Sequence, residues 1–273
     1  MEEKKETMDI TVIIPVHTAD YDMENKLSRA LESVKNAAEQ YTHGNITTVV
    51  VCPPDVKDVL NSKPWDVPFR VIINDTGNTD FCPQINHAVQ YIDTEWFSIL
   101  EWDDTYYPIW FKNVYEYRIG RENVSMFIPI NVVVDSTQNQ YYFGNEMAWA
   151  MEFSSELGTV DFDCLQTTYN FNVTGAVINT KDFISAGMYK PSIKLAFNYE
   201  LLLRMTNSAM GVYVVPKEGY LHTFGSEGSL GKMYMDTIPE NERGAWFDLA
   251  KREYTFTEDR GKGIVLKKEE KLQ

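Results

Sequence analysis

Short apolar runs alternate with amphipathic stretches through the first hundred residues of the chain. β-Branched and other apolar residues fill three runs that turn-forming residues end, at positions 9–16, 46–52 and 69–73. Such runs are typical of buried strands. Apolar residues recur every three to four positions over residues 23–40, and a shorter stretch at 55–60 follows a pair of prolines, which predicts helices. The alternation predicts an α/β fold with parallel strands.

A fourth apolar run ends in acidic residues. Residues 96–100 lead directly into Glu101, Asp103 and Asp104. We therefore expect these acids at the C-terminal end of a strand, the edge at which open α/β sheets bind ligands. Glu101 and Asp103 are two positions apart, so on an extended chain their carboxylates point the same way. Such a pair favours Mg²⁺ or Mn²⁺. Alternatively, the acids only form a turn or cap a helix.

The chain contains no flexible linker and no repeat of fixed period, which favours a single domain. We place it at residues 9–235, with a nucleotide-binding half at 9–108 and an acceptor-side half at 109–235. Residues 1–8 are expected to be a disordered tail, and residues 236–273 a C-terminal helix followed by a charged tail.

The overall charge is strongly acidic. Forty Asp and Glu residues against 25 Lys and Arg residues give a formal net charge of −15, which opposes non-specific binding to nucleic acid or to anionic membranes. The three cysteines lack metal-ligand spacing and are interpreted as reduced and structural. No apolar run approaches the roughly 18 residues of a membrane helix, and the N-terminus lacks the apolar core of a signal peptide. These features predict a soluble, cytoplasmic protein without membrane insertion.

Several short motifs, taken in order, resemble family 2 glycosyltransferases of the GT-A fold. The resemblance runs from about residue 9 to residue 229 and rests on Ile13-Ile-Pro-Val-His17, residues 78–86, Phe97-Ser-Ile-Leu-Glu-Trp-Asp-Asp104, residues 171–189, Phe197-Asn-Tyr-Glu-Leu-Leu-Leu-Arg204, and residues 212–222. It implies a doubly wound, mostly parallel sheet flanked by helices. It also implies transfer of a sugar from a nucleotide-diphosphate sugar, with a UDP-sugar as the expected donor, to an acceptor hydroxyl.

The resemblance also implies a set of donor-side residues. We expect the donor to contact Pro15, His17, Asp20, Asp55, Asn86, Glu101, Trp102 and Asp103. A divalent Mn²⁺ or Mg²⁺ bridging the diphosphate stabilises the leaving group. Its expected ligands are Asp103 directly, Glu101 through water, and His222 from a late loop, with the ribose as the alternative partner of Glu101.

Three departures from the family pattern leave questions open. Cys52-Pro-Pro-Asp55 stands where an Asp-rich loop commonly reads uridine, and Gln84 stands where a basic residue is common. Asn198 stands where the family places its catalytic base, and an amide cannot accept the acceptor's proton.

Glu200 is the nearest replacement for this base, and Asp236 is a second carboxylate. Glu200 and Arg204 are also four positions apart, so the pair is alternatively a helical ion pair. An inverting transfer needs such a base. In a retaining transfer the leaving phosphate takes the proton, and Asn198 serves as a hydrogen-bonding neighbour.

Three functions remain open. The first is transfer to a glycan or a small molecule. The second is a phage-type enzyme whose acceptor is a hydroxymethylated base in DNA, although the acidic charge argues against it. The third is a GT-A-shaped binding protein without catalysis.

Overall fold

One mixed nine-stranded sheet forms the centre of the domain, with strand order β3-β2-β1-β4-β8-β6-β9-β5 and with β7 paired to β6. The computed structural model describes residues 7–19, 22–135, 138, 140–150, 153, 156–226 and 228–252. The first four strands are parallel to one another and are β1 (Ile10–Pro15), β2 (Ile46–Cys52), β3 (Arg70–Ile73) and β4 (Trp96–Ile99). The later strands are β5 (Thr105–Tyr106), β6 (Val124–Asp135), β7 (Gln140–Gly144), β8 (Val177–Asn179) and β9 (Gly211–Phe224).

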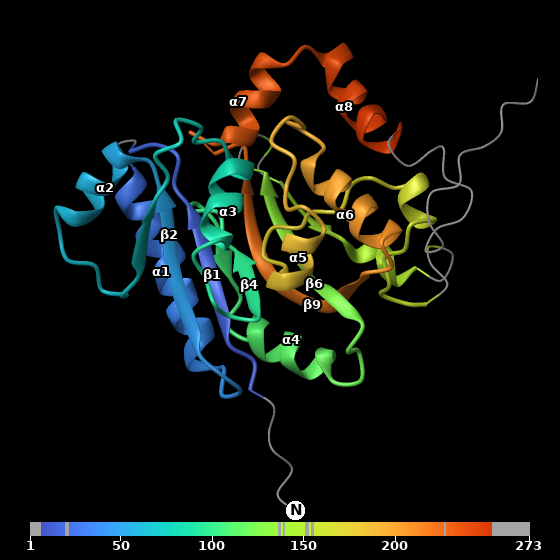
Figure 1. Cartoon of the computed structure of the whole chain (residues 1–273), viewed down its shortest axis with the longest axis horizontal. Coiled ribbons are helices and arrows are strands. Elements are labelled where there is room, and N and C mark those ends of the chain that lie inside the picture. Colours follow the sequence, from blue (N-terminus) through green and yellow to red (C-terminus); the bar gives the residue numbers. More distant parts are fainter. Residues whose placement is uncertain are drawn as a thin grey trace, which may run out of the picture.

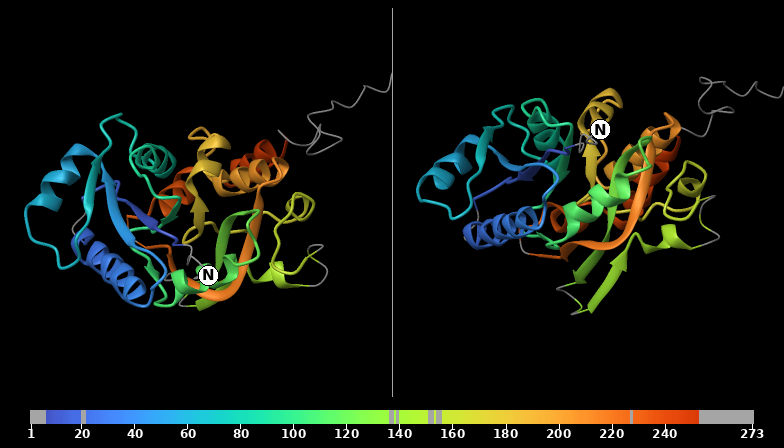
Figure 2. Two further views of the ribbon diagram at one scale, coloured as in Figure 1. Left: turned by 60° about the horizontal axis from the view of Figure 1, so that its bottom comes forward. Right: turned by 90° about the horizontal axis from the view of Figure 1, so that it is seen from below.

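Helices cover both faces of the sheet (Figures 1 and 2). Along β1, Ile10, Val12 and Ile14 pack into one apolar core, whereas Ile13 packs into the core on the other face, as expected for a strand buried on both sides. The first core is covered by α1 (Met23–Glu39), α2 (Pro54–Asn61) and α4 (Trp110–Arg118). The second is covered by α3 (Phe81–Val89), α5 (Thr180–Ser185), α6 (Phe197–Asn207) and α8 (Glu240–Arg252).

The predicted α/β fold is confirmed. The helices and strands predicted in residues 9–100 lie within a few residues of the observed ones. The C-terminal helix expected within residues 236–273 is α8, which covers Glu240–Arg252. Residues 253–273 lie outside the described part. Of the tail predicted at residues 1–8, residues 1–6 lie outside the described part of the chain. Met8 is buried in the apolar core. The predicted domain boundary at residue 235 falls within α7 (Leu230–Thr237).

One strand is longer than predicted. Residues 212–216 and 220–222, expected to be a strand followed by a loop, belong to the single strand β9, which pairs with β6 in parallel over most of its length. The register shifts between Ile128 and Ile130 of β6, opposite the stretch that contains Pro216. Proline donates no ladder hydrogen bond, so a local irregularity accommodates it without ending the strand. His222 consequently lies in a strand and not in a loop.

No helix in the described ranges is long and apolar enough to cross a membrane.

Gly175 is a point at which the fold tolerates no side chain. Its φ is +79°, and a Cβ there would lie 2.4 Å from Cδ2 of Tyr220. We expect Gly175→Ala to lower the free energy of unfolding by about 3 kcal/mol, because left-handed strain and overpacking add. Gly120→Ala is the matched control, since Gly120 has φ +77° with open space around it, and should cost about 1 kcal/mol. Equal losses in urea unfolding would show that the contact with Tyr220 contributes nothing.

Candidate functional site

Two adjoining cavities lie at the C-terminal ends of β1 and β4. The smaller one has a volume of about 30 Å³, and the larger one, which extends towards α6, has a volume of about 210 Å³. Phe81, Glu101, Ser229 and Leu230 line both, so the two cavities form one site. Such an edge is where α/β sheets bind ligands.

Most of the predicted site residues meet here. Pro15, His17, Trp102 and Asp103 line the smaller cavity, Asn198 and His222 line the larger one, and Glu101 lines both. The remaining predictions have other positions: Asp55 is exposed on α2, Asn86 contacts the backbone of Tyr189, Glu200 is fully buried, and Asp20 lies outside the described residues.

The acids after β4 lie on a turn, so the expectation of an extended chain is wrong. The backbone N–H of Asp104 donates to the carbonyl of Glu101 at 3.0 Å. As a result, Glu101, Asp104 and His222 come together, with one ligand atom of each lying within 4.8 Å of the others. Asp103 is not in this group, and its carboxylate accepts a hydrogen bond from the Ser226 hydroxyl.

The chemistry of this group fits a divalent cation. Two carboxylates and one imidazole supply the oxygen and nitrogen ligands that Mn²⁺ accepts, and Mg²⁺ prefers the oxygens. Asp104 also holds the group together, because it accepts hydrogen bonds from Nδ1 of His222 at 2.8 Å and from the backbone N–H of Thr223 at 2.7 Å.

Burial and like charge shift the ionisation of this group. Burial, and next the charge of Asp104, raises the pKa of Glu101 to about 8. Although burial opposes it, the Asp104 carboxylate raises the pKa of His222 to about 9. Without a cation, protons therefore balance the acids at neutral pH. A bound cation would take over this role and release protons.

These pKa values predict that the metal-free protein loses stability as pH rises. Glu101 and His222 both bind their protons more tightly in the folded protein than in the unfolded chain. The stabilisation from these protons is complete below the ordinary pKa values of 4.5 and 6.5, and it is lost as pH rises through the folded-state values of about 8 and 9. Melting temperatures measured with a chelator between pH 5 and 9.5 should therefore fall, and the fall should be shallower in Glu101→Gln. Glu95→Gln, an exposed acid beyond the other end of β4, is the control. A Glu101→Gln curve as steep as that of wild type would contradict this assignment.

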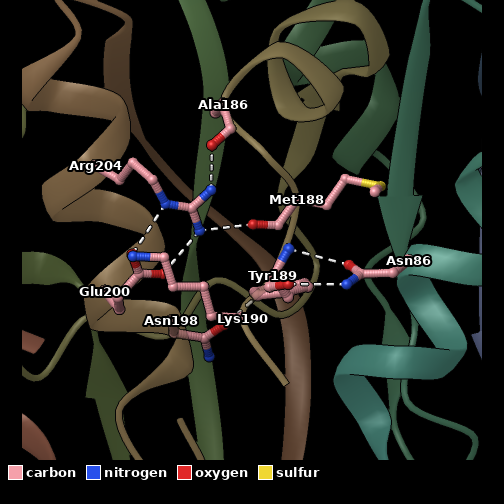
Figure 3. Close-up of polar contacts among 8 residues, drawn as sticks. All are labelled: Asn86, Ala186, Met188, Tyr189, Lys190, Asn198, Glu200 and Arg204. Carbon is pink, nitrogen blue, oxygen red and sulfur yellow. Dashed lines mark hydrogen bonds and ion pairs between the residues drawn. The ribbon is translucent and has the colours of Figure 1, made fainter. Parts of the chain in front are cut away.

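Glu200 is the centre of a buried ion network on α6 (Figure 3). Its side chain is 0% exposed, and its carboxylate lies 2.9 Å and 2.7 Å from Nε and Nη2 of Arg204 and 2.9 Å from Nζ of Lys190. Although burial opposes it, Arg204 and Lys190 lower the pKa of Glu200. Arg204 also donates to the carbonyls of Ala186 and Met188. This is a buried clamp on the 186–190 backbone and not the surface ion pair that the spacing alone suggested.

Asn86 and Asn198 complete this clamp. The Asn86 amide both donates to and accepts from the Tyr189 backbone, at 2.8 and 3.0 Å, and thereby ties α3 to the 186–190 segment (Figure 3). The Tyr189 hydroxyl donates to Oδ1 of Asn198 at 3.2 Å. Residues from both halves of the chain therefore hold Asn198 at the larger cavity.

We expect Glu200→Gln to destabilise the protein by about 3–5 kcal/mol, because it removes the fully buried carboxylate charge that the largely buried Arg204 guanidinium faces. Asp236→Asn is the matched control: Asp236 also forms an i,i+4 pair, with Lys232, but its side chain is 62% exposed. It should change the free energy of unfolding by no more than about 0.5 kcal/mol. Urea unfolding measures both. Lost transfer with unchanged stability in Glu200→Gln would instead favour a catalytic role.

The segment after β9 covers the site. We call residues 225–226 and 228–237 the covering segment, which includes α7. Beyond the Ser226–Asp103 contact, the Gly228 carbonyl lies 2.9 Å from Nε2 of His17, and α7 lies beside α3 at this edge of the sheet (Figure 1). The smaller cavity holds little more than water with the covering segment in this position. A nucleotide would therefore have to displace it.

Sequence reasoning missed several residues that line the larger cavity. Asn172 and Thr174 form a local turn, in which the Thr174 backbone N–H and hydroxyl both donate to Oδ1 of Asn172. Lys194 pairs with Asp80 of the α3 N-terminus. The Asn-x-Thr spacing signals the turn in the sequence, whereas no local signal brings Lys194, more than a hundred residues away, to Asp80.

Comparison with known proteins identifies the family. Residues 11–179 match the family described as Glycosyl transferase family 2, so the chain belongs to this family. No curated protein matches the chain.

Solved structures agree on the fold. S. aureus TarS 1–349 in complex with UDP-GlcNAc is similar with a TM-score of 0.56 at 14% identity, over 90% of this chain and 66% of that one. A second S. aureus TarS structure gives 0.54 at 13% identity, over 92% of this chain and 44% of that one. The chain thus spans less than two thirds of these TarS chains.

Proposed function

We propose that the protein transfers a sugar from a UDP-sugar to an acceptor hydroxyl, with Mn²⁺ or Mg²⁺ as cofactor. The observation that carries this proposal is the group Glu101, Asp104 and His222 at the cavity edge of a family 2 domain. The similarity to TarS, which was solved with UDP-GlcNAc, supports uridine as the nucleoside.

The geometry suggests a role for each side of the site. The cation, held by Glu101 and His222 with Asp104 or Asp103, would neutralise charge on the leaving diphosphate. Pro15, His17 and Trp102 line the part of the site that we assign to the nucleoside. Asn198 lines the larger cavity, where its amide would orient the acceptor hydroxyl.

The proton of the acceptor needs a separate destination. Among the described residues that line the two cavities, the carboxylates are Glu101 and Asp103, both on the donor side. Glu200 is engaged with Arg204 and Lys190, and Asp236 is exposed on α7. This arrangement favours a reaction in which Asn198 positions the acceptor and the proton leaves to the donor phosphate.

Binding of UDP with Mn²⁺ tests the donor and the metal together. A ligand at 100 times its Kd adds about 2.7 kcal/mol to the stability of the native state. We expect UDP with Mn²⁺ to raise the melting temperature more than GDP, CDP or dTDP, and more than UDP with a chelator. Glu101→Gln should lose the Mn²⁺-dependent part of the shift, and Glu95→Gln should keep it.

Release of UDP from UDP-GlcNAc and from other UDP-sugars, followed in the same variants, tests turnover. The absence of a shift with every nucleotide would favour a binding protein without catalysis.

A further inference from the structure

Gln84 of α3 lines the smaller cavity and carries a buried hydrogen-bond acceptor. Its side chain is 0% exposed, and its amide nitrogen donates to the carbonyl of Val16 at 3.0 Å. Its oxygen, Oε1, is buried and has no hydrogen-bond partner among the described residues. Gln84 lines the smaller cavity together with Pro15, His17 and Trp102.

The orientation of this amide follows from its neighbour. The Val16 carbonyl can only accept, so the NH₂ group of Gln84 must face it. The opposite orientation would place two acceptors against each other. Val16 is itself fixed, because its N–H donates to the carbonyl of Val51 at 2.9 Å. Oε1 is therefore held on the side of the amide away from Val16.

An unpaired buried carbonyl destabilises the folded protein, since burying a polar group without a hydrogen-bond partner costs about 1–3 kcal/mol of stability. Native proteins pair nearly all such groups, so this one requires an explanation. A ligand that brings an N–H or O–H to Oε1 recovers the loss. Gln84 lines the cavity of about 30 Å³, and displacement of the covering segment would open room for a larger group there.

The position of Gln84 indicates which part of the donor it meets. The group proposed to hold the diphosphate, Glu101 with Asp104 and His222, reaches across to β9, whereas Gln84 contacts the end of β1. Ribose hydroxyls have the carboxylates Glu101 and Asp103 as acceptors on the same cavity wall. The neutral amide is left to the base.

Uracil offers the matching donor. In a uridine nucleotide the uracil ring carries a single N–H, the imide N3–H. Asp55 follows β2, where an acid commonly reads uridine in the family, but its side chain is exposed on α2. We propose that Oε1 of Gln84 accepts the N3–H of uracil and makes Gln84 a specificity-determining residue for the donor. This inference rests on the proposed function. Cytosine presents a lone pair at N3, so CDP would face Oε1 with a second acceptor.

N3-methyl-UDP tests this contact directly, because it lacks only the proton in question. Calorimetric titration with Mn²⁺ should show N3-methyl-UDP and CDP binding wild type about 10- to 100-fold more weakly than UDP. Gln84→Met, which keeps the length but removes the acceptor, should weaken UDP by a similar factor. In this variant N3-methylation should cost little more, since the two changes remove one interaction. Gln90→Met, at the exposed C-terminal end of α3, is the control and should bind as wild type does.

Each outcome has a distinct meaning. If N3-methylation weakens UDP binding equally in wild type and Gln84→Met, the effect is steric. If it weakens binding in neither, Oε1 does not contact N3. Both results overturn the inference while the proposed function stands. If wild type does not bind UDP, the proposed donor fails and the inference fails with it. Should Gln84→Met not fold, the comparison of UDP, N3-methyl-UDP and CDP on wild type decides alone.

Discussion

The site depends on the turn after β4, and hydrogen bonds with residues of β9 hold this turn in place. The Glu101 backbone N–H donates to the Tyr220 hydroxyl at 3.0 Å, and Asp104 accepts from His222 and Thr223. Three consecutive contacts therefore connect residues that are more than a hundred positions apart. Because β9 runs on past Pro216 as one strand, these groups are fixed by the sheet and not by a loop.

The same constraint sets the electrostatics of the site. The turn brings two carboxylates and an imidazole together, where burial and the charge of Asp104 raise the pKa of Glu101, and the Asp104 carboxylate raises the pKa of His222. Such an arrangement costs stability unless a proton or a cation balances it. Strain of this electrostatic kind is common where function requires a charged ligand, and it separates this cluster from the Glu200 network, in which the buried carboxylate already has two cationic partners.

The sequence alone was sufficient for the fold and for most of the site. Periodicity located the strands of the first half, because parallel strands buried on both faces form continuous apolar runs. The place of Glu101 at the sheet edge followed from the strand before it. The choice between Asp103 and Asp104 did not follow, because a turn and an extended chain present different side chains to the site.

The environment of Glu200 was also beyond local reasoning. The spacing to Arg204 predicts an ion pair, but burial and the contribution of Lys190 depend on how the 186–190 segment folds back. Likewise, the unpaired oxygen of Gln84 becomes visible only when the Val16 carbonyl fixes the amide. Tertiary contacts, not sequence spacing, decide whether such a residue clamps the backbone or meets a ligand.

Two departures from the family pattern share one physical theme. Gln84 stands where the resemblance leads one to expect a basic residue, and Asn198 where it leads one to expect an acid, so a neutral amide replaces a charge on each side of the site. An amide recognises by direction, since it donates on one side and accepts on the other, whereas a charge attracts from all directions. It neither takes up a proton nor attracts a diphosphate at long range. The roles proposed for Gln84 and Asn198 would thereby separate recognition of base and acceptor from the charge balance, which is left to the turn after β4 and the cation proposed to bind there.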